Sequence, residues 1–325
     1  MKRYKHKAFV FALIFLSNAA FTLAQEAKTT GAFGDPIRVN VDRVTVGVTV
    51  AGTHGNLIKS LRREDFRVYD NGVAQEVTGF SPIEEPAQVV LLMETGPAAV
   101  FIRPGALRAA EAFLRSISAT DRVAIVSYSK TPNLELDFTA DKSKVREALG
   151  SLNFLNGYSQ LNLVSSVLST LDWLSSLPGK KTIVLVSTGL NDSIPTNWQL
   201  VQQKLEISDV QILAVSTAGP IRDPVKQKNL SPDERDDRKY VREGFVEADQ
   251  LLHQLAEATG GRAYFPKNAK EFNDAYDEIA QFVRNEYRLE FVPRSSDGQL
   301  HSLKVKVRSH WYHVNFRQAY LAPAS

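Results

Sequence analysis

The stretch VVLLMETGPAAV, residues 89–100, decides the fold. Its first five residues are all apolar, which is typical of a strand that helices cover on both faces. The apolar run ends at Glu94, and small residues follow it. We therefore expect a buried parallel strand that carries a carboxylate to the edge of a sheet.

The sequence around this stretch alternates strands with helices between residues 87 and 286. Two further apolar runs, KTIVLVSTG and VQILAVSTAG, have the same character, and amphipathic segments separate them. One of these amphipathic segments begins at Asp141, a residue type that favours a helix start. The alternation predicts an α/β domain with a doubly wound, mostly parallel sheet. The charged, proline-containing residues 217–244 are expected to form a long surface loop.

Two segments with the sequence pattern of β-strands flank this domain, at residues 37–83 and 287–320. The first contains Asp70-Asn71-Gly72, which predicts a hairpin turn. Neither segment alone offers enough strands for a stable core. The α/β domain, residues 87–286, is therefore expected to be inserted into a discontinuous β-sandwich-like domain that both segments build.

The first 24 residues have the pattern of a secretory signal peptide. A cationic start, MKRYKHK, precedes an apolar stretch, and Thr22 and Ala24 occupy the small-residue positions of a cleavage site. Residues 25–36 predict a flexible leader. No later segment is apolar enough to span a bilayer after cleavage. The expected location is periplasmic or extracellular.

Composition excludes several classes of function. The 325 residues contain no cysteine, so disulfides, thiolate metal ligands and a cysteine nucleophile are excluded. The formal net charge is only +3, and much of the basic surplus lies at the N-terminus, so no nucleic-acid partner is expected. The sequence has neither a G-x-S-x-G nucleophile turn nor a glycine-rich phosphate loop.

Several stretches together resemble a known family. They are LRREDFRVYDNGVAQEVTGF, VVLLMETG, DRVAIVSYS, KTIVLVSTG, LAEATGGRAYFP, YRLEFVP and AYLAP. In order and spacing they are similar to von Willebrand factor A domain proteins of the "VWFA-related" type found among secreted acidobacterial proteins. The resemblance covers nearly the whole mature chain, and it implies a von Willebrand factor A-like fold.

The resemblance also implies a place for a divalent cation, the metal-ion-dependent adhesion site of that family. The five motif positions fall on Glu94, Gly96, Ala98, Ser159 and Thr188. Gly96 and Ala98 have no side-chain oxygen, and Thr188 brings a hydroxyl without charge, whereas Mg²⁺ prefers several hard oxygen ligands. We interpret the motif as degenerate and expect no metal and no other cofactor, with bound Mg or Ca as the alternative.

The expected function is that of a secreted, non-enzymatic protein-binding module, adhesive or scaffolding, that is independent of cations. Open α/β sheets bind ligands beyond the carboxyl ends of their strands. The expected partner-binding rim comprises Glu94, Thr95, Tyr158, Ser159, Thr188, Leu190 and Asp192. One alternative is a cation-dependent adhesion module that uses Glu94 and Ser159, with Asp192 as a compensating carboxylate. Another is an exported hydrolase or small-ligand binding protein on the same sheet. The partner protein is not identified by the sequence.

Overall fold

A six-stranded sheet forms the centre of the α/β part in the computed structural model, in the order β10-β9-β8-β5-β6-β7. All neighbours in this sheet are parallel except β6 and β7, which are antiparallel. The strands are β5 (Gln88–Glu94), β6 (Arg122–Tyr128), β7 (Pro132–Thr139), β8 (Lys181–Ser187), β9 (Val210–Ser216) and β10 (Arg262–Tyr264). The predicted doubly wound, mostly parallel sheet is therefore confirmed.

The structure describes residues 43–53, 56–82, 86–96, 107, 110–154, 160–193, 195, 197–219 and 232–324, and for 232–242 it describes the backbone only. From Val41 onward the chain forms one compact unit. The predicted signal peptide and leader lie outside the described residues and stay predictions. No helix among the described residues has the length and apolar character that crossing a membrane requires.

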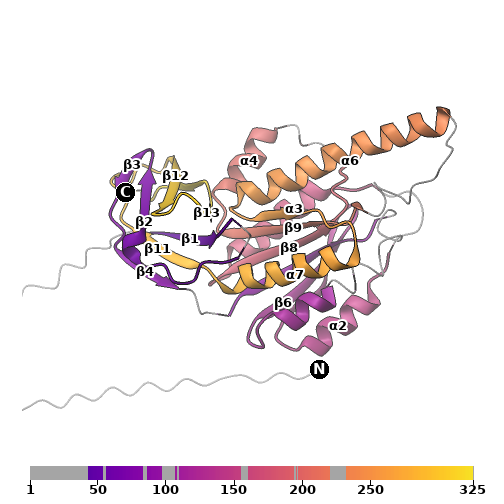
Figure 1. Ribbon diagram of the computed structural model, residues 1–325, viewed down its shortest axis with the longest axis horizontal. Helices are drawn as coiled ribbons and strands as arrows, with labels where there is room; N and C mark the ends of the chain where they lie inside the picture. The colour runs from indigo at the N-terminus through magenta and orange to yellow at the C-terminus, as the bar shows by residue number, and fades with distance from the viewer. Residues whose placement is uncertain are drawn as a thin grey trace, which may run out of the picture. The chain divides into compact units, whose positions relative to one another are not determined.

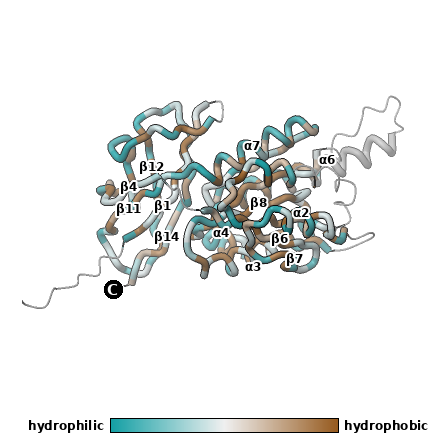
Figure 2. Tube along the Cα trace, turned by 90° about the horizontal axis from the view of Figure 1, so that it is seen from below, coloured by the Kyte–Doolittle hydropathy of each residue, from teal (hydrophilic) through white to brown (hydrophobic). Residues whose placement is uncertain are grey.

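Helices cover both faces of the central sheet (Figure 1). They are α2 (Lys142–Ser151), α3 (Leu163–Ser175), α4 (Trp198–Glu206), α6 (Pro232–Ala258) and α7 (Ala269–Arg284), and residues 110–116 are also helical. Val89, Leu91 and Met93 of β5 pack against α2, α7 and the helical residues 110–116. Val90 and Leu92 face the opposite way, toward α3, α4 and α6. Successive side chains of a strand point to opposite faces, so a strand buried on both faces must be apolar throughout, as the hydropathy colouring shows for the central strands (Figure 2).

Helix starts follow the local sequence signals, with one correction. Asp141 accepts hydrogen bonds from the backbone N–H groups of Ser143 and Lys144, so it caps α2 as predicted. The predicted loop at 217–244 is wrong over its second half, because α6 begins at Pro232. Proline is favoured in the first turn of a helix, and the charged residues that follow are good helix formers. Their charge was the basis of the loop prediction, yet charge does not oppose a helix.

The flanking segments combine into two four-stranded sheets, ordered β13-β1-β11-β4 and β14-β12-β2-β3. Their elements are β1 (Val44–Ala51), a 3₁₀ turn η1 (Arg63–Asp65), β2 (Phe66–Asp70), β3 (Val73–Gln75), β4 (Gly79–Pro82), β11 (Tyr287–Phe291), β12 (Leu300–Val307), β13 (His313–Asn315) and β14 (Ala319–Leu321). Asn71 and Gly72 form the predicted turn between β2 and β3, both with positive φ.

Each of these two sheets joins strands from both ends of the chain. In one sheet β1 pairs antiparallel with β11, with Val46 opposite Leu289. In the other, β2 pairs antiparallel with β12, with Val68 opposite Val305. All four residues, together with Phe66, belong to one buried cluster. Neither half alone could therefore bury this cluster.

Candidate functional site

Glu94 is the last residue of β5, and it lies at the carboxyl edge of the central sheet. Strand alternation directs its side chain to the same face as Val90 and Leu92, toward α3 and α6. Only 3% of the residue is exposed. A carboxylate buried to this extent needs hydrogen-bond donors, because transfer of a charge out of water costs several kcal/mol.

The donors come from the ends of the two neighbouring strands. One oxygen, Glu94 Oε2, accepts hydrogen bonds from the Thr188 backbone N–H at 2.7 Å and the Thr188 hydroxyl at 2.8 Å. The Ser187 hydroxyl donates to the same oxygen at 3.0 Å, and the Tyr128 hydroxyl lies 3.4 Å away. Tyr128 OH also donates to Ser187 Oγ at 2.7 Å. Glu94 thus ties together the carboxyl ends of β6, β5 and β8; we call Glu94, Tyr128, Ser187 and Thr188 the carboxylate cluster.

The electrostatics of the carboxylate cluster combine two opposing effects. Burial raises the pKa of Glu94 above its ordinary value, and the hydrogen bonds from Thr188, Ser187 and Tyr128 offset only part of that rise. Burial and the neighbouring Glu94 charge together raise the pKa of Tyr128. Glu94 Oε1 is buried and has no hydrogen-bond partner among the described residues. The carboxylate is therefore bound on one oxygen by protein donors, at the cost of leaving the other oxygen unpaired.

The described residues do not fit the divalent cation that the family resemblance implies. The Thr188 N–H, which cannot coordinate a metal, is directed at Glu94 Oε2. The space beside Gly96 is filled, because a Cβ there would lie 2.4 Å from Leu161 Cδ2. A serine ligand could not stand at this position unless Leu161 moved. No group of three or more metal-ligating His, Cys, Asp or Glu side chains occurs among the described residues.

Asp192, the compensating carboxylate of the cation-dependent alternative, has another role. Its Oδ2 accepts a hydrogen bond from the Leu161 backbone N–H at 2.7 Å, and its own N–H donates to the Leu161 carbonyl at 2.8 Å. Asn191 Oδ1 accepts from the Val164 N–H in the first turn of α3 at 3.3 Å. These bonds join the loop after β8 to the segment before α3. Asp192 therefore orders the edge of the sheet.

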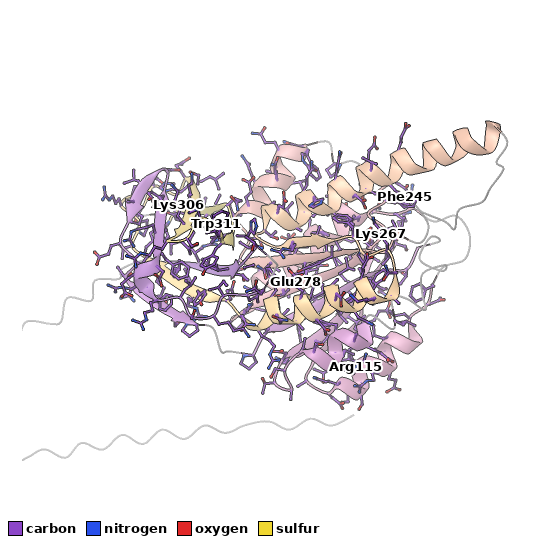
Figure 3. The ribbon with its side chains drawn as sticks, viewed as in Figure 1. Arg115, Phe245, Lys267, Glu278, Lys306 and Trp311 are labelled. Carbon is purple, nitrogen blue, oxygen red and sulfur yellow. The ribbon has the colours of Figure 1, made fainter. Side chains whose placement is uncertain are left out.

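Leu190 lies on a small apolar surface beside the carboxylate cluster. Gly189 has a φ of 82°, and a Cβ at this position would lie 2.6 Å from the Ala248 carbonyl oxygen, so the loop after β8 can approach α6 this closely only with glycine. Half-buried Leu190 then packs against Ala218, Phe245 and Ala248. Figure 3 shows Phe245 on α6, on the side that faces the sheet.

A groove of about 410 Å³ continues from Leu190 between the loop after β8 and α6. We call it the α6 groove. Its lining is mainly apolar and includes Leu190, Pro195, Trp198 and Leu251. Glu247, which is exposed, is the one charged side chain among the described lining residues.

Several side chains that the sequence analysis placed on the partner-binding rim do not reach the surface. Glu94, Thr95 and Thr188 are at most 5% exposed, because their polar atoms bond one another or neighbouring strand ends. Leu190 is half-buried and Asp192 is exposed. Ala98, Tyr158 and Ser159 lie outside the described residues. The residues that the sequence analysis missed are Tyr128, Ser187 and Leu161; strand-end hydroxyls in VSTG were the available signal for Ser187.

Comparisons with known proteins found one family match and several similar solved structures. Residues 104–190 match the family model of the von Willebrand factor type A domain. An aerotolerance-related membrane protein from Bacteroides fragilis is 16% identical, with a TM-score of 0.45 over 61% of this chain and 98% of that one. A von Willebrand factor type A protein from Catenulispora acidiphila is 10% identical, with a TM-score of 0.43 over 89% of this chain and 75% of that one. A search of curated proteins found no match.

Proposed function

Given that this chain contains a von Willebrand factor type A domain, we propose that it is a non-enzymatic binding module whose ligand is another protein. The binding surface is the α6 groove together with the adjoining loop of Leu190, Asn191 and Asp192. The single observation that carries this proposal is the division of the sheet edge into two parts. Glu94 Oε2 and Asp192 Oδ2 accept hydrogen bonds from within the protein, while an apolar groove lies beside them.

The lining of the α6 groove defines the chemistry of the partner. Trp198 and Leu251 are half-buried, so an apolar side chain placed between them would lose most of its contact with water. Exposed Glu247 offers a negative charge at the border of the groove. The partner is a polypeptide segment with a large apolar anchor residue and an adjacent lysine or arginine, because opposite charges at the border favour the encounter.

Binding by this module does not require a cation. Support comes from Glu94, whose Oε2 already receives the Thr188 N–H, and from Leu161, which fills the space beside Gly96. The module acts outside the cytoplasm, and the signal-peptide pattern of residues 1–24 supports this location.

A peptide library displayed on phage tests the proposal without knowledge of the natural partner. The mature protein is immobilised, and enriched peptides are synthesised for fluorescence polarisation. We expect them to carry an aromatic or aliphatic residue next to a basic one. Leu190→Asp should weaken their binding at least tenfold, since it places a charge in the apolar lining.

The matched control is Leu134→Asp, on β7 at the other edge of the sheet, where Leu134 is 51% exposed. This variant should bind the peptides as the unmodified protein does. Equal affinity for the unmodified protein and Leu190→Asp would place the binding surface elsewhere. A requirement for Mg²⁺ or Ca²⁺ in the same assay would favour the cation-dependent alternative.

A further inference from the structure

His301, on β12, is a buried histidine that lies between two carboxylates of the β-sandwich. Only 5% of the residue is exposed. Its Nδ1 lies 2.7 Å from Asp70 Oδ1, and its Nε2 lies 3.2 Å from each carboxylate oxygen of Asp297. The second oxygen of Asp70 accepts a hydrogen bond from the Tyr320 hydroxyl at 3.0 Å. We call Asp70, Asp297, His301 and Tyr320 the histidine cluster.

The geometry of the histidine cluster fits a charged imidazolium and not a neutral ring. A neutral histidine has one N–H donor and one acceptor nitrogen, and an ionised carboxylate can only accept. Both ring nitrogens of His301 face carboxylate oxygens. A neutral ring could donate to only one carboxylate, and its other nitrogen would direct a lone pair at the second. Only the protonated ring donates to both.

The electrostatics of the histidine cluster agree with this geometry. Burial lowers the pKa of His301, but the hydrogen bonds and charges of Asp297 and Asp70 outweigh burial, so the pKa lies above its ordinary value of about 6.5. The Gln299 backbone N–H and the His301 ring hold the pKa of Asp297 below its ordinary value. Burial and the hydrogen bond to Asp70 raise the pKa of Tyr320, so its hydroxyl stays a donor.

The basic residues closest to the histidine cluster in the chain act elsewhere. Lys304 and Lys306, on β12 itself, point to the opposite and exposed face of the sheet. The charge of Arg317, just before β14, acts on Tyr320. The ring of His301 therefore faces a carboxylate at the end of β2, a carboxylate in the turn before β12 and the Tyr320 hydroxyl on β14.

Asp297 links the histidine cluster to the C-terminal segment, residues 319–324. It forms an isolated β-bridge with Ala324. Two backbone hydrogen bonds, at 2.9 and 3.1 Å, join the residues that follow Asp297 to Ala322 and Pro323. Strand β14, in this segment, has only three residues and lies at the edge of its sheet. So short an edge strand depends on the turn that contains Asp297.

We propose that the histidine cluster is a pH-dependent switch that holds the C-terminal segment closed while His301 is protonated. Loss of the proton leaves one N–H, which stays with buried Asp70 at the shorter distance, and the lone pair of Nε2 then repels Asp297. The turn separates from His301, and residues 319–324 open. This switch is separate from the α6 groove, and it does not depend on the proposed protein partner.

The direction of the switch follows from linkage. The folded protein holds the proton of His301 at pH values where the unfolded chain has lost it, since the folded-state pKa is raised. The stabilisation is therefore fully present below the ordinary pKa of about 6.5, and it is lost as the pH rises through the folded-state value. The closed state belongs to acidic and the open state to alkaline conditions.

Hydrogen exchange of the full mature chain, followed by mass spectrometry from about pH 5.5 to pH 9.5, tests the proposal. The exchange rates are divided by the intrinsic rates at each pH, so that only protection by structure is compared. We expect protection of residues 319–324 to fall at least tenfold as the pH rises, while the central strand β5 keeps its protection. Equal protection of residues 319–324 at both ends of the range would overturn the proposal.

Variants assign the pH dependence to His301. His301→Gln cannot titrate, so its protection of residues 319–324 should not change with pH. Asp297→Asn should stay protected at alkaline pH, because the asparagine amide can donate to the neutral ring where a carboxylate cannot. The matched control is His313→Gln, since His313 is an exposed histidine on β13 of the same β-sandwich. It should keep the pH dependence of the unmodified protein.

The Asp297→Asn variant decides the outcome if His301→Gln does not fold, because Asp297 is exposed and its replacement leaves the buried members of the histidine cluster in place. A tenfold fall in protection that persists in Asp297→Asn would assign the pH dependence to another group and refute the switch. Loss of the pH dependence in His313→Gln would refute it as well.

Discussion

The two ends of the central sheet hold a charged side chain in different ways. At the carboxyl end, Glu94 receives hydrogen bonds from the ends of both neighbouring strands on a single oxygen. At the amino end, half-buried Arg317 bonds two carbonyls, and its Nε has no hydrogen-bond partner among the described residues. At the carboxyl end, N–H and hydroxyl donors therefore converge on one carboxylate oxygen, whereas at the amino end backbone carbonyls bond the two outer nitrogens of a guanidinium.

The largest expected effect comes from removing the Glu94 carboxylate. Glu94→Ala leaves the Thr188 N–H and the Ser187 and Thr188 hydroxyls without their acceptor, and we expect a loss of about 3 kcal/mol in the free energy of unfolding. Arg317→Met should cost less than about 1 kcal/mol, because Arg317 is only half-buried and the change removes two hydrogen bonds to carbonyls. Urea denaturation of both variants measures the difference.

Glu111→Ala is the control for this comparison, because the Glu111 side chain is 53% exposed. It should change the free energy of unfolding by less than about 0.5 kcal/mol. Similar losses in Glu94→Ala and Arg317→Met would erase the contrast between the two ends. A loss below about 1 kcal/mol in Glu94→Ala would mean that water replaces the carboxylate without penalty.

A smaller effect should appear in the pH dependence of stability. The folded-state pKa of Glu94 is raised, so the folded protein holds the proton at pH values where the unfolded chain has lost it. The contribution of Glu94 is therefore most favourable below its ordinary pKa and is lost as the pH rises through the folded-state value.

Glu94→Gln cannot titrate and serves as the reference. The unmodified protein should lose stability relative to Glu94→Gln between pH 4.5 and pH 8, as measured by urea denaturation across that range. Parallel pH profiles for the two proteins, or a relative gain of the unmodified protein at high pH, would show that hydrogen bonding outweighs burial at Glu94.

The sequence predicts those parts of the structure that neighbouring residues determine. The apolar run at Gln88–Glu94, the Asn71-Gly72 turn and the Asp141 cap are local, and all three were predicted. The start of α6 at Pro232 was missed because charged residues suit both loops and exposed helices. The family resemblance identified Glu94 as a motif position.

The surroundings of both ends were beyond local signals. The donors to Glu94 stand 34 to 94 positions away in the chain, and no spacing rule links Tyr128 to Ser187. The contact of Gly96 with Leu161 likewise depends on packing. Arg317 joins Thr45, 272 positions earlier, and Ile207, so its contacts become visible only after folding.

A rebuilt motif sharpens the central claim that Glu94 and its donors stand in place of a cation. The variant restores four ligand positions and removes the side chain that fills one of them: Glu94→Asp, Gly96→Ser, Ala98→Ser, Thr188→Asp and Leu161→Ala. We expect this protein to melt at a higher temperature in millimolar Mg²⁺ than in EDTA, because an ion that binds only the folded state stabilises it by mass action. The same variant with Leu161 retained should gain less, since a Cβ at position 96 meets Leu161 Cδ2.

The most direct test is the melting curve of the unmodified protein in millimolar Mg²⁺, in Mn²⁺ and in EDTA, at matched ionic strength. The Glu94 carboxylate already receives the Thr188 and Ser187 donors, so the three curves should superimpose. A saturable rise in melting temperature with either cation would show that the carboxyl end of the sheet still binds a metal, and it would contradict the account given for Glu94.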